Sequence, residues 1–300
     1  MPSLDPTKTA TLRQRYSQAM NRRFRLLATD VRKSIIDNDG FGFRTNQPAP
    51  RNAFNFPTSS QKVAAFQEWL RREIDRGILE VIFRSGTTVR SHREWQNHFI
   101  RSAYIRAVTD SEAQLSRAGQ LVAPLDIAIG LEAGVHVETL ELMFTRVFEG
   151  LRGITDSMAG DLSEVLTQAL IDGVGPRVIA KRITDRIGSI SRRRALVLAR
   201  TEIIRAYSES TLNIFEQNGI EGVAADVEFH TAGDSRVCQR CLALEGNIYT
   251  LSEARGIIPV HPRCRCAWLA ANIGESAEDV RARNQRKTKA RARRRELEAA

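Results

Sequence analysis

All four cysteines of this 300-residue chain lie between Cys238 and Cys266, and the residues before them contain none. The first pair forms the segment Cys238-Gln239-Arg240-Cys241, and the second pair, Cys264-Arg265-Cys266, follows after 22 residues. A CxxC segment supplies two thiolates from one tight turn, and a second pair of ligands from a separate turn completes a tetrahedral site. The clustering therefore predicts a small C-terminal module built around these side chains.

The module offers more ligands than one metal ion needs. His261 precedes Cys264 with HxxC spacing, so this pair is an alternative to the Cys264 and Cys266 pair, and His230 is a further substitute. Spacing alone does not choose the fourth ligand. We expect a structural Zn²⁺ as cofactor, with its ligands among Cys238, Cys241, Cys264, Cys266 and His261. Nearby arginines would favour thiolates over thiols: Arg236, Arg240, Arg263 and Arg265.

Two other states of the cysteines remain open from the sequence. They are disulfide or redox pairing, and reduced thiols without a ligand. A catalytic zinc is not expected, because four good ligands leave no open coordination position.

The chain before the cysteines shows the three- and four-residue apolar spacing of amphipathic helices. The first helix is expected on a face formed by Leu12, Tyr16, Met20, Phe24, Leu27, Val31 and Ile35. Residues 38–58 predict a long connecting loop with aromatic anchors, namely Phe41, Phe43, Phe54 and Phe56. Thr58 and Gln61 have the spacing of a capping box, which predicts a helix from there to Gly77. A β-like run at 78–83 and a helix from Glu94 follow.

The longest helical pattern runs from residue 140 to residue 169 and resembles a coiled-coil seam. Three glycines within it favour either a break or a close helix crossing: Gly150, Gly153 and Gly160. A turn at 172–175 precedes Pro176, which suits the first position of a new helix. A last long helix is expected over residues 191–217.

These patterns predict a mainly α fold: a multi-helix, elongated body followed by a small C-terminal Cys-rich α+β module and a basic tail. Short strands at 227–230 and 247–250 would supply the β part. We expect four regions, which are an N-terminal helical region at 1–130, a central helical region at 131–220, the Cys-rich module at 221–272 and the tail at 273–300.

The net charge of +10 is concentrated at the C-terminal end. Nine cations lie within residues 281–295, which contain no acid: Arg281, Arg283, Arg286, Lys287, Lys289, Arg291, Arg293, Arg294 and Arg295. The rest of the chain is therefore nearly neutral. Such a tail predicts non-specific contact with DNA phosphates, or else a solvated end that binds an acidic protein surface.

Two further segments suggest chemistry less strongly. Residues 173–186 are compatible with a helix-turn-helix, but an ordinary helical hairpin with Val178, Ile179 and Ile183 in a core is commoner. Glu202 and Arg205 are better explained as an ion pair on one helix than as a catalytic site. No basic segment followed by an apolar run begins the chain, and no stretch approaches the roughly 20 apolar residues that span a bilayer. We therefore expect a soluble protein without a membrane partner.

Three segments together resemble the phage Mu F-like minor head protein family. The stretch from Arg194 to Glu202 is similar to the family's "RA…ARTE" helix. The stretch from His230 to Cys241, with its CxxC, resembles a second block. The last, His261-Pro262-Arg263-Cys264-Arg265-Cys266, resembles the family's "HPxCRC" ending. Their order and spacing agree over roughly residues 140–270.

The resemblance implies a virion protein and not an enzyme: a minor head component inside the head or at the portal vertex, assembled in the host cytoplasm. Its partners would be the portal protein, with scaffold or major capsid protein in addition, and it would act in procapsid assembly and in DNA packaging or ejection. The alternative class is a zinc-containing DNA-binding protein or an HNH-like nuclease, since such enzymes also combine CxxC turns with histidines.

Overall fold

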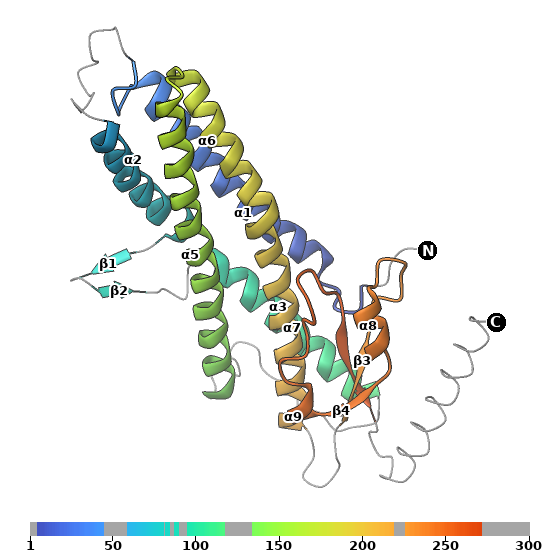
Figure 1. The fold of residues 1–300 in the computed structure, drawn as a ribbon. Helices are drawn as coiled ribbons and strands as arrows, with labels where there is room; N and C mark the ends of the chain where they lie inside the picture. The colour runs from blue at the N-terminus through green and yellow to red at the C-terminus, as the bar shows by residue number, and fades with distance from the viewer. Residues whose placement is uncertain are drawn as a thin grey trace, which may run out of the picture. The chain divides into compact units, whose positions relative to one another are not determined.

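A computed structural model describes residues 5–44, 59–80, 82–84, 87–89, 95–117, 134–218 and 226–271 of the chain. Within these ranges most residues are helical, and a small sheet lies near the cysteines (Figure 1). The predicted mainly α class with a small C-terminal α+β module is confirmed. The long helices are α1 (Ala10–Arg32), α2 (Ser59–Ile74), α3 (Trp95–Arg117), α5 (Gly134–Ile171), α6 (Pro176–Ile190) and α7 (Leu196–Asn218). Three π-helical turns extend or join them: η1 (Lys33–Asp37), η2 (Asp75–Leu79) and η3 (Ser191–Ala195).

The chain groups into two compact units. Residues 13–99 and 142–200 form one, which we call the helical unit. Residues 1–12, 100–141 and 201–300 form the other, which we call the cysteine unit because it contains all four cysteines. The unit boundaries fall inside α1, α3, α5 and α7. The four sequence regions expected above are a different division of the chain and stay a prediction.

In the helical unit, α1 buries the apolar face that its spacing predicts. Its buried side chains are Tyr16, Met20, Phe24, Leu27 and Val31, and Ile35 continues the face into η1. Tyr16 stacks on Phe99 with ring centroids 4.6 Å apart. The predicted first helix is therefore confirmed, and it ends at Asn38, as expected.

The segment after α1 agrees with the sequence in part. Phe41 and Phe43 are buried, and Phe41 meets Phe66 edge-to-face at 5.4 Å. Phe54, Phe56 and Thr58 lie outside the described residues. The β-like run at 78–83 was placed too early. Its first two residues belong to η2, and the strand β1 (Ile82–Arg84) pairs with β2 (Thr87–Val89) in a hairpin.

Helix α5 continues without a break through Gly150, Gly153 and Gly160. A Cβ built on Gly150 would lie 3.1 Å from Leu198 Cδ1, whereas nothing lies within 4 Å of a Cβ at Gly153 or Gly160. Of the two alternatives that the glycines left open, the structure therefore excludes a break and shows a close helix crossing at Gly150. The crossing helix is the first turn of α7, and the other two glycines have no such packing reason.

The turn between α5 and α6 has the predicted chemistry. Gly173 adopts a positive φ of 63°, and Pro176 occupies the first turn of α6. Ile179 and Ile183 are buried as a helical hairpin requires, but Val178 is 43% exposed, contrary to prediction. An ion pair from Arg182 Nη1 to Asp172 Oδ2 at 2.6 Å joins α6 to the turn that precedes it.

In the cysteine unit, three antiparallel strands lie in the order β4-β3-β5, with β3 (Asp226–His230) in the centre. The edge strands are β4 (Ile248–Thr250) and β5 (Ala267–Ala271), and the short helices α8 (Gln239–Leu244) and α9 (Leu251–Ala254) connect them. Trp268 is fully buried, with Phe229 and Tyr249 edge-on to its ring at 5.5 and 5.6 Å. The sheet thus has an aromatic core, and β5 begins directly after Cys266.

Candidate metal centre

The first pair of cysteines lies on a turn that opens α8. Cys238 is the N-cap residue of α8, and its carbonyl oxygen accepts a hydrogen bond from the backbone N–H of Leu242. Its Sγ accepts hydrogen bonds from the backbone N–H groups of Cys241 and Arg240. These bonds stabilise the thiolate and lower the pKa of Cys238. The CxxC turn therefore presents one half-buried and one buried sulfur.

The second pair of ligands lies on a turn before β5. The backbone N–H of Cys264 donates to the carbonyl oxygen of His261 at 3.1 Å. Arg263 closes this turn in the left-handed region, with φ of 66°. Because the turn is tight, His261 and Cys264 point to one region of space. The HxxC segment is thus a second ligand-bearing turn, comparable to the CxxC turn.

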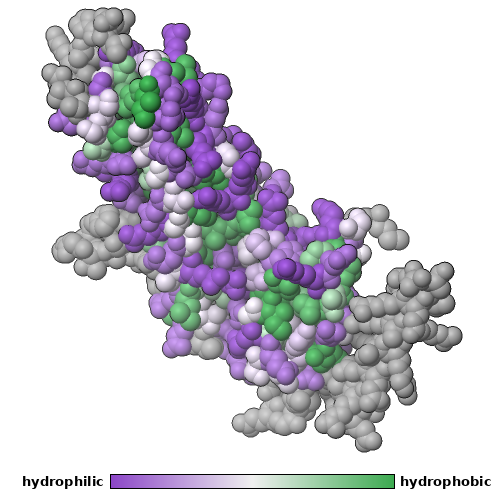
Figure 2. All heavy atoms as spheres, in the orientation of Figure 1, coloured by the Kyte–Doolittle hydropathy of each residue, from purple (hydrophilic) through white to green (hydrophobic). Residues whose placement is uncertain are grey.

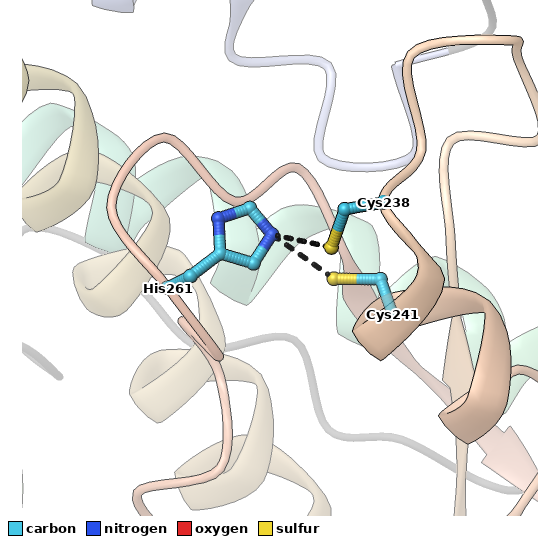
Figure 3. A group of neighbouring side chains, drawn as sticks. All are labelled: Cys238, Cys241 and His261. Carbon is cyan, nitrogen blue, oxygen red and sulfur yellow. Dashed lines mark hydrogen bonds between the residues drawn. The ribbon is translucent and has the colours of Figure 1, made fainter.

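The two turns meet. His261 Nε2 lies 3.2 Å from Cys238 Sγ and 3.2 Å from Cys241 Sγ, as Figure 3 shows. Cys241 Sγ lies 4.0 Å from Cys264 Sγ. The ligand atoms of Cys241, Cys264 and Cys266 also lie within 4.8 Å of one another. The five predicted ligands therefore form two adjoining groups that share Cys241, and the cluster could hold a metal ion.

The pKa values of the thiols differ according to their hydrogen bonds and burial. The thiol of Cys266 donates to Cys264, which lowers the pKa of Cys264 to about 5 and raises that of Cys266. Burial raises the pKa of Cys241 to about 12. A divalent cation in the cluster would offset that cost, because it stabilises neighbouring thiolates. Thiolate and imidazole donors of this kind suit Zn²⁺.

One sequence-based expectation about the surroundings needs correction. His230 does not join the cluster, and its Nδ1 pairs with Glu245 Oε1 at 3.2 Å. Arg236 and Arg265 were expected to favour thiolates. Both bind the carboxylate of Asp234, at 2.9 and 2.5 Å, and Arg265 is also attracted by the sulfur of Cys266. That carboxylate competes with the thiolates for these two guanidinium groups. Backbone N–H groups and the Cys266 thiol are the main support of the thiolates instead.

Some residues that position the cluster were missed in the sequence. The Thr201 hydroxyl accepts a hydrogen bond from the backbone N–H of Arg263 at 3.2 Å, which fixes the HxxC turn against α7. Thr250 and Glu253 form a reciprocal capping box at the start of α9. The T-x-x-E pattern is a signal from which that helix start could have been predicted. Nothing in the sequence marks the partner of Thr201.

The remaining predicted sites fall outside this geometry. The nine cations of residues 281–295 lie outside the described residues. Glu202 and Arg205 form the expected pair one turn apart on α7, with Arg205 Nε 3.3 Å from Glu202 Oε2. In the described part of the chain, no helix is long and apolar enough to cross a membrane.

Comparison with known proteins gives one family. Residues 160–269 match the model of a family described as phage Mu protein F like protein. Over this region the chain is similar to phage Mu F-like proteins. Neither a curated protein nor a solved structure matches it. The Mu F-like region begins within α5 and ends within β5, so it includes both turns that carry the candidate ligands and the helix that holds Thr201.

The match to the Mu F-like family over this region indicates a protein of phage head morphogenesis, one that interacts with other head proteins in the virion. The predicted family is therefore confirmed. Its "HPxCRC" ending is the HxxC turn with the adjoining Cys266. The "ARTE" helix supplies the hydroxyl that binds this turn. The motifs are thus explained by local geometry that builds the metal centre.

Proposed function

We propose that this chain is a minor head protein of a tailed phage that associates with the portal vertex and acts in procapsid assembly. The observation that carries the proposal is the family match, which spans the metal centre and the helices leading into it. Contact with the portal protein, and with scaffold or major capsid protein, is the expected form of the interaction. A protein at the portal vertex would lie where DNA enters and leaves the head, so we also propose a role in DNA packaging or ejection.

The helical unit is the proposed contact surface. Four of its large apolar side chains are exposed, namely Leu26 (53%), Leu142 (72%), Ile171 (73%) and Val178 (43%). On the face drawn in Figure 2, apolar residues lie among hydrophilic ones. Exposed apolar side chains of this size favour contact with other proteins over contact with DNA.

Procapsid binding tests this proposal directly. The full chain should co-purify with portal oligomers from procapsids. Replacing Leu142, Ile171 and Val178 together by Gln should reduce incorporation several-fold, because the apolar contact area is lost. Leu242→Gln is the matched control, since Leu242 is 54% exposed but belongs to the cysteine unit. A wild-type chain absent from procapsids refutes the proposal, and loss with Leu242→Gln alone moves the interface to the other unit.

We further propose that the cysteine cluster binds one structural Zn²⁺. The proximity of His261 Nε2 to two sulfurs supports it. Reduced, full-length protein should contain about one zinc per chain, as a tetrahedral Cys/His site requires. Replacing Cys238 and Cys241 together by Ser should unfold the module around the sheet and leave most of the helical signal. Protein that lacks zinc, and that is as stable in the double variant as in the wild type, contradicts this proposal.

The nuclease alternative finds no support among the described residues. An HNH-like enzyme would need a catalytic metal held by further histidines beside the cysteines, whereas His230 lies outside the cysteine groups and His261 lies within one of them. A nicking assay with divalent metal is the simple check. The basic tail remains the proposed DNA contact, and its test is given in the Discussion.

A further inference from the structure

We infer that the metal ligands are Cys238, Cys241, His261 and Cys264, and that Cys266 is a non-ligating thiol that hydrogen bonds to the bound sulfurs. This inference rests on the proposed zinc site and names its donor set. The cluster has five candidates for four positions, so one of them must lie outside the coordination sphere. The sequence leaves that choice open, whereas the geometry distinguishes the candidates.

His261 belongs to the set because of its distances. With Zn–S of about 2.3 Å and Zn–N of about 2.0–2.1 Å, a tetrahedron places nitrogen about 3.6 Å from sulfur, and two sulfurs about 3.8 Å apart. His261 Nε2 lies 3.2 Å from the sulfurs of both Cys238 and Cys241. These separations need only small side-chain adjustments to surround an ion.

The tautomer of His261 gives independent support. Its Nδ1 lies 2.8 Å from the carbonyl oxygen of Pro262, which can only accept a hydrogen bond. Nδ1 therefore carries the proton, and the Nε2 lone pair faces the two sulfurs. Metal-bound histidines commonly donate their other ring N–H to such an acceptor, which orients the ring.

Cys264 is the fourth ligand because it repeats the environment of Cys238. It lies on the same tight turn as His261, and its Sγ accepts backbone N–H groups of Cys266 and Val260. Cys238 Sγ likewise accepts two backbone N–H groups from its own turn. Cys264 Sγ also lies 4.0 Å from Cys241 Sγ, close to the separation expected in a tetrahedron. Two equivalent turns thus supply two ligands each.

Cys266 lies outside the HxxC turn. Its sulfur and that of Cys264 both group with the sulfur of Cys241, and neither groups with Cys238 and His261, so the turn and not this grouping favours Cys264 as the ligand. It directly precedes β5, and its side chain is 2% exposed. From there its S–H donates to the sulfur of Cys264. Such a donor orients a ligand and moderates its charge without binding the metal.

Cobalt substitution and zinc affinity of full-length variants test the assignment. Cys264→Ser should weaken zinc binding by more than about 100-fold, beyond the range of outer-shell substitutions. Cys266→Ser retains a hydrogen-bond donor, so it should change affinity by less than about tenfold and keep a three-thiolate Co²⁺ charge-transfer spectrum. Equal losses in the two variants, or a larger loss for Cys266→Ser, would overturn the inference.

X-ray absorption on the zinc-loaded wild type removes any dependence on variant folding. It should count three sulfurs and one nitrogen around the metal. A count of four sulfurs would mean that Cys266 binds the metal in place of His261. That result would refute the ligand set while leaving the zinc proposal intact. A wild type that binds no zinc or cobalt refutes both proposals together.

Discussion

The backbone N–H of Arg263 donates to the Thr201 side-chain hydroxyl at 3.2 Å, across 62 residues of sequence. This bond joins the two most recognisable segments of the family, the helix ending in "ARTE" and the "HPxCRC" turn. Arg263 has a positive φ of 66°, so its N–H is held in a turn that no sheet or helix stabilises. Thr201 thus fixes the second ligand-bearing turn to a rigid helix.

Thr201→Val should therefore loosen the turn while preserving the side-chain shape. The lost hydrogen bond should reduce the free energy of unfolding by about 0.5–1 kcal/mol, at the lower end for intramolecular bonds because Arg263 is exposed. Urea denaturation measures the change, and hydrogen exchange at the Arg263 amide should accelerate. Thr109→Val is the control, since the Thr109 hydroxyl bonds only to its own helix and is exposed. Equal effects of both variants would remove the special role of Thr201.

Asp234 provides a second connection around the cluster, because its carboxylate binds both Arg236 and Arg265. These two guanidinium groups, Arg265 first, hold the pKa of Asp234 well below its usual range. A carboxyl with a lowered folded pKa stabilises the fold above its unfolded pKa of about 3.9, and this contribution is lost as pH falls through the folded pKa. Asp234→Asn should thus be less stable than wild type at pH 7.

The pH dependence separates this pair from an ordinary surface pair. The difference between wild type and Asp234→Asn should shrink only below about pH 4, where the carboxyl is protonated in the unfolded chain while it is still ionised in the folded protein. Asp185→Asn is the matched control, since its exposed pair with Lys181 should contribute little. Denaturation midpoints at pH 7, 5 and 3 measure both variants. A difference that is unchanged at the lowest pH would contradict the ion-pair explanation.

The sequence predicts the helices because apolar spacing reports burial directly. The face of α1 and the opening of α6 at Pro176 agree closely with the structure. The boundaries of helices and strands were less predictable. The run at 78–83 has β-forming residues, but its first two residues belong to the helical turn η2. Nor does local spacing predict that Gly150 packs against Leu198, because that contact depends on a distant helix.

At the site, spacing identifies the donor types but not their selection. The five candidate ligands do come together, because the two turns are local structures encoded by CxxC and HxxC. The pairing of His230 with Glu245 was not predictable, since it depends on the register of β3 beside the loop after α8. Similarly, the carboxylate that binds Arg265 lies 31 residues away.

A buried histidine in the cysteine unit should make stability depend on pH. His136 is fully buried, with Nδ1 2.7 Å from the Tyr104 hydroxyl and Nε2 3.0 Å from Gln217 Oε1. Burial lowers the pKa of His136 because the charged ring loses solvation. Its contribution is therefore present above the unfolded pKa of about 6.5 and is lost as pH falls below it.

The measurement compares stability between pH 7 and pH 5.5. Wild type should lose stability over this range more steeply than His136→Gln, which cannot titrate. His98→Gln, at an exposed position on α3, should keep the wild-type slope. Ring NMR signals should also give His136 a pKa below 6.5. A pKa of His136 at or above that value would contradict the effect of burial.

Glycines of α5 offer a packing test. Gly153→Ala should stabilise the protein by about 0.5–1 kcal/mol, because alanine reduces the entropy lost on helix formation and the site is open. Gly150→Ala should gain less or lose stability, since its new Cβ would press on Leu198 at 3.1 Å. Urea denaturation of both variants gives the comparison. Equal gains would show that the α5–α7 crossing tolerates a larger residue.

The basic tail should bind DNA through phosphates without reading sequence. Nine cations in residues 281–295, with no aromatic side chain among them, provide charge but little means of base recognition. Each neutralised phosphate releases counterions, so the logarithm of the binding constant should fall with the logarithm of salt by about 0.9 per contact. Affinity should also differ little between unrelated duplexes.

Deleting residues 281–300 tests the tail against its alternative, an acidic surface on a partner protein. The shortened chain should lose most DNA affinity and most of its salt dependence, because the remaining chain is nearly neutral. Procapsid incorporation should persist, since the helical unit is the proposed contact surface. Circular dichroism checks that the fold is retained. Unchanged DNA affinity together with lost incorporation would assign the tail to protein assembly, and DNA would then have to contact another part of the chain.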